Sequence, residues 1–176
     1  MSGRIVAVLI LMSALIAGAV LYYLQIYAFY EEVALSPQEV VLVSLTTGEP
    51  ETIAARDVQA IDADSSPIRF RACFSTDLSL PTLTEGYVPA EAIEPRNAPG
   101  WFDCFDAAAI GAQIEAGTAL TFLGQKNIGY GVDRVVAITQ DGHGYIWHEL
   151  NDCGEKAYDG TVVGEECPPR PDMAGQ

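Results

Sequence analysis

The sequence predicts an α+β protein: an N-terminal transmembrane helix, then one small antiparallel-sheet domain with one main helix and two disulfides. Three observations support this fold class. Residues 5–30 carry no charged side chain, residues 39–150 contain short apolar runs separated by turn residues, and all four cysteines lie beyond the apolar segment. Without its anchor, the chain of 176 residues retains about 145 residues, which is enough for one domain with its own core.

Residues 5–30 are predicted to cross a lipid bilayer as a helix, since about 20 apolar residues span its hydrocarbon core. Arg4 precedes this run, whereas Glu31 and Glu32 follow it. The cytoplasmic flanks of membrane helices are enriched in Lys and Arg. Residues 1–4 are therefore expected to be cytoplasmic, and the residues after the helix are expected to be extracytoplasmic. Tyr and Phe side chains near the end of the run suit the membrane interface.

Two alternatives concern this segment. Ala17, Gly18 and Ala19 fit the cleavage site of a signal peptide, but an apolar stretch from Val20 onward would then begin the mature chain. A retained anchor is therefore favoured. Ala14 and Gly18 are also spaced as in small-xxx-small motifs, which predicts either a partner helix or only the ordinary composition of a span.

The four cysteines, Cys73, Cys104, Cys153 and Cys167, predict two disulfides in an oxidising compartment. Three pairings are possible, and the favoured one is Cys73–Cys104 with Cys153–Cys167. The second bridge would close a segment rich in Gly and Glu, where a crosslink compensates for missing apolar material.

The first half of the domain contains two clear strand patterns. After a predicted tether at 31–38, the Val-rich residues 39–45 indicate a strand and 46–50 a turn, whereas 51–63 fits neither period. Residues 68–74 alternate, which places Ile68, Phe70, Ala72 and Phe74 on one face and Arg69, Arg71 and Cys73 on the other.

The second half begins with a loop-rich, proline-containing segment at 79–100, interpreted as an exposed contact surface. A helix is predicted next, capped by Asp103 and ended by Gly117, with Ala107, Ile110 and Ile114 on its buried face. Strands follow at 118–123, 133–139 and 145–150, and the last two form a hairpin. The domain thus covers 39–167, and 168–176 is expected to be a flexible tail.

The outer part of the chain is strongly acidic. Beyond residue 30 it contains 24 acidic and eight basic residues, a net charge of −16. Nucleic acid is therefore excluded as a partner, because phosphates require a basic surface. The charge suits solubility outside the cytoplasm, or else a basic partner or bound cations.

Few residues suggest a binding site. Asp62 and Asp64 resemble the start of a calcium loop, but the glycine and glutamate expected later in such a loop are missing, so they are only weak metal candidates. Arg69 and Arg71 could grip an anion or a partner, or could pair with Asp103 or Asp106.

The two histidines, His143 and His148, have opposite parity on one strand, which argues against a shared metal site. No nucleophile elbow, phosphate loop or dinucleotide fingerprint is present, and no cofactor is predicted. The expected function is that of a non-enzymatic accessory or assembly protein bound to a membrane-protein partner. The alternatives are a ligand- or cation-binding sensor module and, less favoured, an envelope hydrolase.

Four segments resemble a family of short membrane-anchored proteins of Rhodobacter-like alphaproteobacteria. They are Met1–Val6, Tyr22–Glu31, Ser66–Phe74 and Trp101–Asp106. The resemblance implies a bacterial inner membrane with the domain in the periplasm, and it carries over no catalytic residue. Some members bear a histidine kinase label, which this sequence does not support because it has no nucleotide-binding glycine loop.

Overall fold

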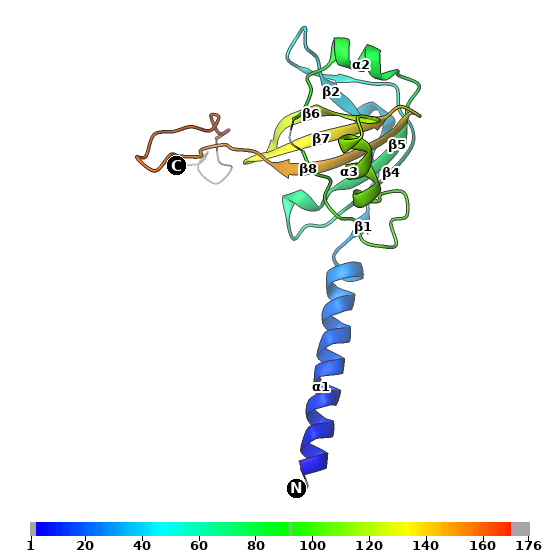
Figure 1. Cartoon of the computed structure of the whole chain (residues 1–176), viewed down its shortest axis with the longest axis vertical. Coiled ribbons are helices and arrows are strands. Elements are labelled where there is room, and N and C mark those ends of the chain that lie inside the picture. Colours follow the sequence, from blue (N-terminus) through cyan, green and yellow to red (C-terminus); the bar gives the residue numbers. More distant parts are fainter. Residues whose placement is uncertain (1–2, 92, 170–176) are drawn as a thin grey trace.

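A computed structural model describes residues 3–91 and 93–169 (Figure 1). It shows a long helix leading into one α+β domain. The helices are α1 (Gly3–Tyr23), α2 (Leu80–Gly86) and α3 (Ala107–Glu115), with a π-helical turn at Leu24–Ala28 and 3-10 turns at Pro37–Glu39 and Pro67–Arg69. The strands are β1 (Glu31–Glu32), β2 (Val41–Val43), β3 (Pro50–Thr52), β4 (Arg56–Asp62), β5 (Arg71–Ser75), β6 (Ala119–Gly129), β7 (Val132–Thr139) and β8 (His143–Leu150).

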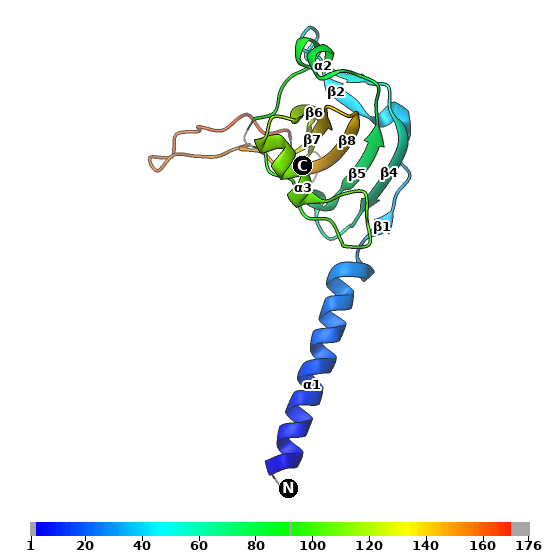
Figure 2. The same ribbon diagram turned by 45° about the vertical axis from the view of Figure 1, so that its right-hand side comes forward.

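Helix α1 stands apart from the domain and has no buried residue (Figures 1 and 2). With its continuation to Tyr27 it is long and apolar enough to cross a membrane, although a signal sequence meets the same criteria. Together with the disulfides, this helix indicates an extracytoplasmic protein.

Six antiparallel strands form the main sheet in the order β1-β4-β5-β8-β7-β6, and β2 and β3 pair separately. Tight turns join β6 to β7 and β7 to β8, so the three strands form a meander. Gly142 in the second turn has a φ of +83°, and a Cβ there would lie 2.4 Å from the Thr76 carbonyl oxygen. Only glycine satisfies both conditions.

The sheet buries apolar side chains on both faces. On one face, Ala72 and Phe74 of β5 join a core that includes Leu42 of β2 and Leu83 of α2. On the other face, Cys73 joins a second core that includes Ile110 of α3. Figure 2 shows the curved sheet with α3 against one side and β2 and α2 at its upper end. The predicted alternation along β5 is therefore confirmed, and both of its faces are covered.

Several boundaries differ from the sequence prediction. The ambiguous residues 51–63 carry the end of β3 and all of β4. Residues 80–86 of the predicted loop form α2, because Ser79 caps the helix by accepting a hydrogen bond from the Thr82 amide and Pro81 suits its first turn. Residues 67–69 form a 3-10 turn in place of the start of a strand.

The predicted cap of the main helix is wrong by three residues. Asp106 is the N-cap, and its carboxylate accepts hydrogen bonds from the amides of Ala108 and Ala109. Asp103 lies in the preceding turn, next to the disulfide-bonded Cys104. The predicted end at Gly117 is confirmed, since this residue has a φ of +70° directly after the C-cap.

Both favoured disulfides are present. Cys73–Cys104 joins β5 to the turn before α3, and Cys153–Cys167 closes the segment after β8. The first bridge lies within the second core, whereas the second stabilises a segment with few buried side chains. The predicted tether at 31–38 contains β1 and is hydrogen-bonded to β4 from the Val33 amide to the Ala60 carbonyl. The predicted tail falls largely outside the described residues.

Candidate functional site

Arg71 is buried and directs its guanidinium group to backbone carbonyl oxygens rather than to a carboxylate. It donates to the carbonyls of Arg96 and Asn97 at 3.0 and 3.1 Å, and to those of Ile68 and Phe70 at 2.9 and 2.6 Å. Burial lowers the pKa of Arg71. The side chain thus fixes the segment around residue 96 to the sheet.

Arg69 is half-buried and lies over the ring of Tyr30, with 5.5 Å between its guanidinium carbon and the ring centroid. Its Nη1 is buried without a hydrogen-bond partner, and within residues 3–91 and 93–169 no carboxylate pairs with the side chain. The expected pairing of these arginines with Asp103 or Asp106 is therefore wrong. Their role as an anion or partner contact stays a prediction, and only Arg69 has a guanidinium group free of other hydrogen bonds.

The proline-containing segment 79–100 was interpreted as an exposed contact surface, but much of its part after α2, together with Trp101, packs on the domain. Ile93, Ala98 and Trp101 contact the second core, and Arg71 holds the backbone as described above. The Arg96 side chain also forms an ion pair with Glu149 of β8. This segment therefore acts mainly as a cover for the sheet, because β5 and β8 would otherwise expose apolar side chains there.

His148 was not singled out as a buried residue from the sequence, yet it is 5% exposed. Its Nδ1 donates to the Pro67 carbonyl at 2.8 Å, and its Nε2 accepts from Arg134 at 3.2 Å. Burial lowers the pKa of His148 to about 4; the Pro67 carbonyl opposes this shift and the positive charges of Arg134 and Arg71 add to it. The imidazole is neutral at pH 7 and both nitrogens are occupied, so it is not available as a general base.

His143 lies apart from His148, at the exposed turn between β7 and β8. Its Nδ1 lies 3.2 Å from a carboxylate oxygen of Asp141. A hydrogen bond from Thr139 lowers the pKa of Asp141, and His143 adds to the shift. The separation of the two histidines agrees with the parity argument from the sequence.

Asp62 and Asp64 line a small cavity of about 200 Å³ together with Glu31 and Ser65. Glu31 and Asp62 are directly opposite each other in the β1–β4 pair. The Asp62 carboxylate already accepts a hydrogen bond from the Ala63 amide. Over the part of the chain that the structure describes, no group of three or more ligating side chains is arranged to hold a metal ion.

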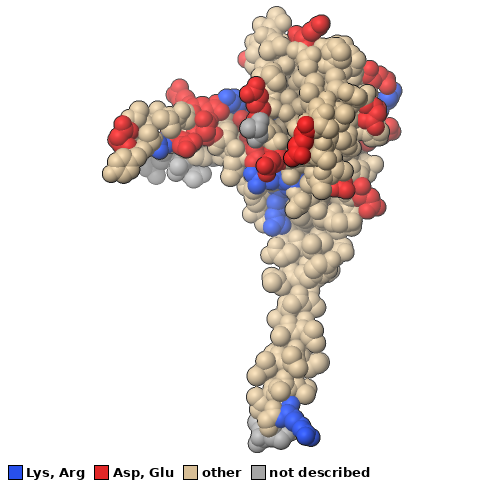
Figure 3. All heavy atoms as spheres, viewed as in Figure 1, with Lys and Arg blue, Asp and Glu red and all other residues tan. Residues whose placement is uncertain are grey.

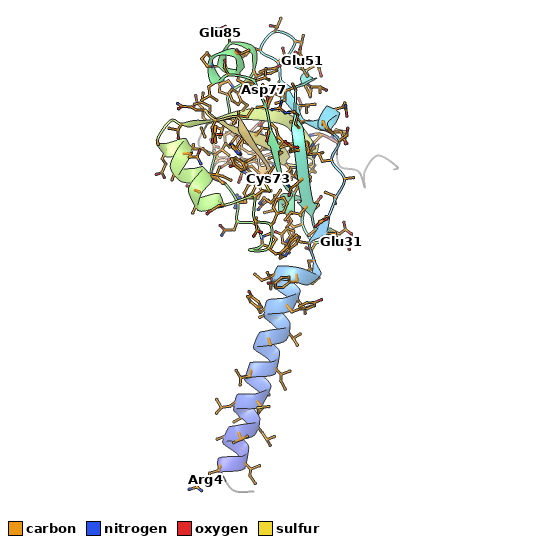
Figure 4. All side chains as sticks on the ribbon, turned by 90° about the vertical axis from the view of Figure 1, so that its right-hand side faces the viewer. Arg4, Glu31, Glu51, Cys73, Asp77 and Glu85 are labelled. Carbon is orange, nitrogen blue, oxygen red and sulfur yellow. A yellow bond between two sulfur atoms is a disulfide. The ribbon has the colours of Figure 1, made fainter. Side chains whose placement is uncertain are left out.

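The junction between helix and domain is the most specific interaction at the base of the molecule. The Trp101 indole donates from Nε1 to the Ile26 carbonyl at 3.0 Å, and Tyr30 packs against the second core. Trp101 and Phe102 also line a groove of about 380 Å³ with residues 32–35 and 58–60. The domain is therefore held to the end of the helix by side-chain contacts as well as by the chain itself. Figure 4 shows Glu31 between the end of α1 and the domain.

Residues 151–169 form an arm that extends from the end of β8, away from the sheet and sideways from α1 (Figures 1 and 2). An ion pair between Lys126 of β6 and Glu165 fixes its base. Near its tip Tyr158 is fully exposed, and Val162 and Val163 are 58% and 59% exposed. The sequence predicts a disulfide loop here, but no pattern in it indicates this projecting shape. Ala14 and Gly18 lie on exposed α1, where the predicted partner helix stays a prediction.

Comparison with known proteins identifies a family for the domain. No curated protein and no solved structure shows significant similarity to the chain. Residues 40–168, which include all of the domain from β2 to the arm, match a family of unknown function, DUF6446. Of the resemblance stated from the sequence, this match supports one part, namely that the chain belongs to a family without an assigned activity. The matched segment covers more than half of the chain, and the protein belongs to the family of unknown function DUF6446.

Proposed function

We propose that the protein is a non-enzymatic accessory or assembly factor of an envelope complex, held by residues 5–30 in a bacterial inner membrane with its domain in the periplasm. In this proposal the amino terminus is cytoplasmic. The basic Arg4 before the helix and the acidic Glu31 after it favour this orientation. The partner is a membrane protein with an extracytoplasmic part beside the domain.

The observation that carries this proposal is the arm at 151–169. A large aromatic side chain that is fully exposed on a protruding loop has no role in its own core, and such side chains are typical interface anchors. Tyr158 satisfies this description, and Val162 and Val163 extend the apolar surface beside it. The Cys153–Cys167 bridge restricts the loop before binding, which reduces the entropy lost on association.

The charge of the arm indicates which surface it fits. Five acidic residues and one lysine lie on the described arm: Asp152, Glu155, Asp159, Glu165, Glu166 and Lys156. Figure 3 shows acidic side chains along the arm and in several separate places on the visible face of the domain. A partner with a basic rim around an apolar pocket would complement both features. The sideways direction of the arm suits a neighbour in the same membrane (Figure 1).

Site-specific photocrosslinking in intact cells tests this proposal. A photoreactive residue at Tyr158 or Val162 is expected to crosslink to the same membrane protein, through a peptide rich in Lys and Arg. The same residue at Leu45, an exposed side chain next to β2, is the matched control and should not give this product. Tyr158→Ala should reduce co-purification of the partner at least tenfold after mild detergent extraction.

Isolation of the chain only as a monomer, with no product from either arm position, would overturn the proposal. A sensor module remains the alternative, and calorimetry with calcium and small anions distinguishes it. Heat that disappears in Arg69→Gln or Asp62→Asn, with no partner captured by the arm, would favour that alternative.

A further inference from the structure

The base of the domain is the surface around Tyr30, Arg69 and Trp101, and it is held close to the C-terminal end of the helix. Only Phe29 and Tyr30 separate the π-helical turn from β1, and the Trp101 indole is hydrogen-bonded to a carbonyl within that turn. Tyr30 packs into the second core and carries the Arg69 guanidinium over its ring. The domain therefore cannot move far from the helix end without breaking these contacts.

The length of the helix places this base relative to a bilayer. Starting from Ile5, about 20 helical residues at 1.5 Å per residue cross about 30 Å of hydrocarbon and end near Leu24. Each headgroup layer adds about 6 Å beyond the hydrocarbon. At the same rise this layer takes in about four helical residues after Leu24, so Ile26 lies within the headgroup layer, as does Trp101, which contacts it. Tyr30 and the Arg69 side chain over its ring lie at the outer boundary of the layer.

Both side chains suit that layer. Tryptophan prefers the membrane interface, as do Tyr22, Tyr23 and Tyr27, which are exposed at the same end of the helix. A guanidinium group that is stacked on an aromatic ring and lacks hydrogen-bond acceptors matches a phosphodiester, whose oxygens accept two parallel hydrogen bonds. Among the described residues, Arg69 is stacked on Tyr30 and its Nη1 is buried without a partner, so a phosphodiester would bind the other nitrogens of its guanidinium group. The Arg71 guanidinium group lies close by, because it donates to the carbonyl of Ile68.

Acidic side chains near the base of the domain limit the lipid contact to a single headgroup. Glu31 and Asp62 face each other on the β1–β4 edge, with Asp64 beside them, and Glu149 neutralises Arg96. A broadly anionic membrane would therefore be repelled by one edge of the base. The ligand that remains compatible is the phosphodiester of a single headgroup, which zwitterionic and anionic phospholipids share.

We propose that the base of the domain is a lipid-contact surface, with Trp101 in the headgroup layer and Arg69 bound to a phospholipid phosphodiester. This inference depends on the proposed function only in that residues 5–30 must remain in the bilayer. It goes beyond that function because it assigns a lipid ligand to a surface other than the arm.

Tryptophan fluorescence of the full chain in phosphatidylcholine nanodiscs tests the depth. Trp147 is fully buried and is the only other tryptophan, so Trp147→Phe leaves Trp101 as the reporter and Trp101→Phe is the matched control. A spin label on the lipid headgroup should quench Trp101 at least threefold more than a label at the end of the acyl chain, and more than it quenches Trp147. If Trp147→Phe fails to fold, the difference between wild type and Trp101→Phe gives the same quantity.

Solid-state NMR between guanidinium ¹³C and lipid ³¹P tests the ligand. Dephasing of arginine signals by phosphorus should fall by about half in Arg69→Gln, because Arg4 at the opposite end of α1 still contributes. Arg56→Gln, which removes an exposed arginine paired with Asp77, should leave the dephasing unchanged. Inorganic phosphate added to the chain in detergent should not reproduce the Arg69 signal.

Equal quenching of both tryptophans, or dephasing that is unaffected in Arg69→Gln, overturns the inference. Extraction of the chain from membranes by alkaline carbonate would instead contradict the anchor itself. The two failures are thus distinguishable.

Discussion

Arg134 and His148 are directly opposite each other on β7 and β8 and share a hydrogen bond of 3.2 Å between Nε and Nε2. Phe70 stacks on the imidazole, with 4.6 Å between the ring centroids, and the Arg134 guanidinium carbon lies 4.8 Å from the same Phe70 ring. This arrangement joins two strands to the residue before β5 and fixes the neutral imidazole as an acceptor toward Arg134.

The stability of the domain is expected to fall in acid because of His148. Its pKa is lowered to about 4 in the folded chain from 6.5, so the unfolded chain binds a proton that the folded chain does not. Above pH 6.5 His148 causes no loss of stability. As the pH falls from 6.5 to about 4, protonation of the unfolded chain lowers the free energy of unfolding, and below about pH 4 this residue causes no further change. The loss amounts to about 3 kcal/mol at most.

Urea unfolding between pH 4 and 7 measures this effect. In His148→Gln the unfolding free energy should be lower at pH 7 but should change less with pH across this window. His143→Gln, at the exposed turn, is the control and should retain the wild-type slope. A His148→Gln curve parallel to that of wild type would contradict the assignment.

Replacing Arg71 should destabilise the domain strongly. Arg71→Met leaves the carbonyls of Arg96 and Asn97 without their side-chain donor, for an expected loss of about 3 kcal/mol in unfolding free energy. Arg56→Met removes only an exposed ion pair with Asp77 and should have little effect. Urea midpoints of the two variants compare them directly, and similar midpoints would argue against a structural role for Arg71.

The two disulfides should contribute unequally to global stability. The loop-entropy relation gives about 3.7 kcal/mol for the Cys73–Cys104 bridge, with a sequence separation of 31. Replacing both of these cysteines with alanine should lower the thermal midpoint accordingly. The Cys153–Cys167 bridge closes an arm outside both cores, so its double alanine variant should increase hydrogen exchange in 151–169 with little change in that midpoint.

A pair of alanine variants tests the helix cap. Asp106→Ala removes the acceptor of two amide hydrogen bonds at the start of α3 and should cost about 1 kcal/mol. Asp103→Ala changes an exposed turn residue without that role and should be nearly neutral. Equal losses in chemical denaturation would show that the cap does not stabilise the helix.

Much of the secondary structure follows from local patterns. The alternation in 70–74 gave the two faces of β5, and the turn at 140–144 gave the β7–β8 hairpin. Asp103 was mistaken for the cap because it resembles Asp106 in type and position. The hydrogen bonds that Asp106 accepts from the Ala108 and Ala109 amides show where the helix begins. The helix α2 was missed because prolines indicate loops unless one occupies a first turn after a serine cap.

The sequence by itself determined the apolar helix, the acidic composition and the fold class, because these depend on residue type and spacing along the chain. It left three pairings of the cysteines open, and only the structure shows that the favoured one is present. Only the tertiary structure decided that Arg71 binds carbonyls, that His148 is buried and neutral, that Trp101 reaches Ile26 and that the arm projects from the sheet. These features arise from contacts between segments far apart in sequence, such as residues 26 and 101. No local pattern encodes them, since the partners meet only when the sheet has formed.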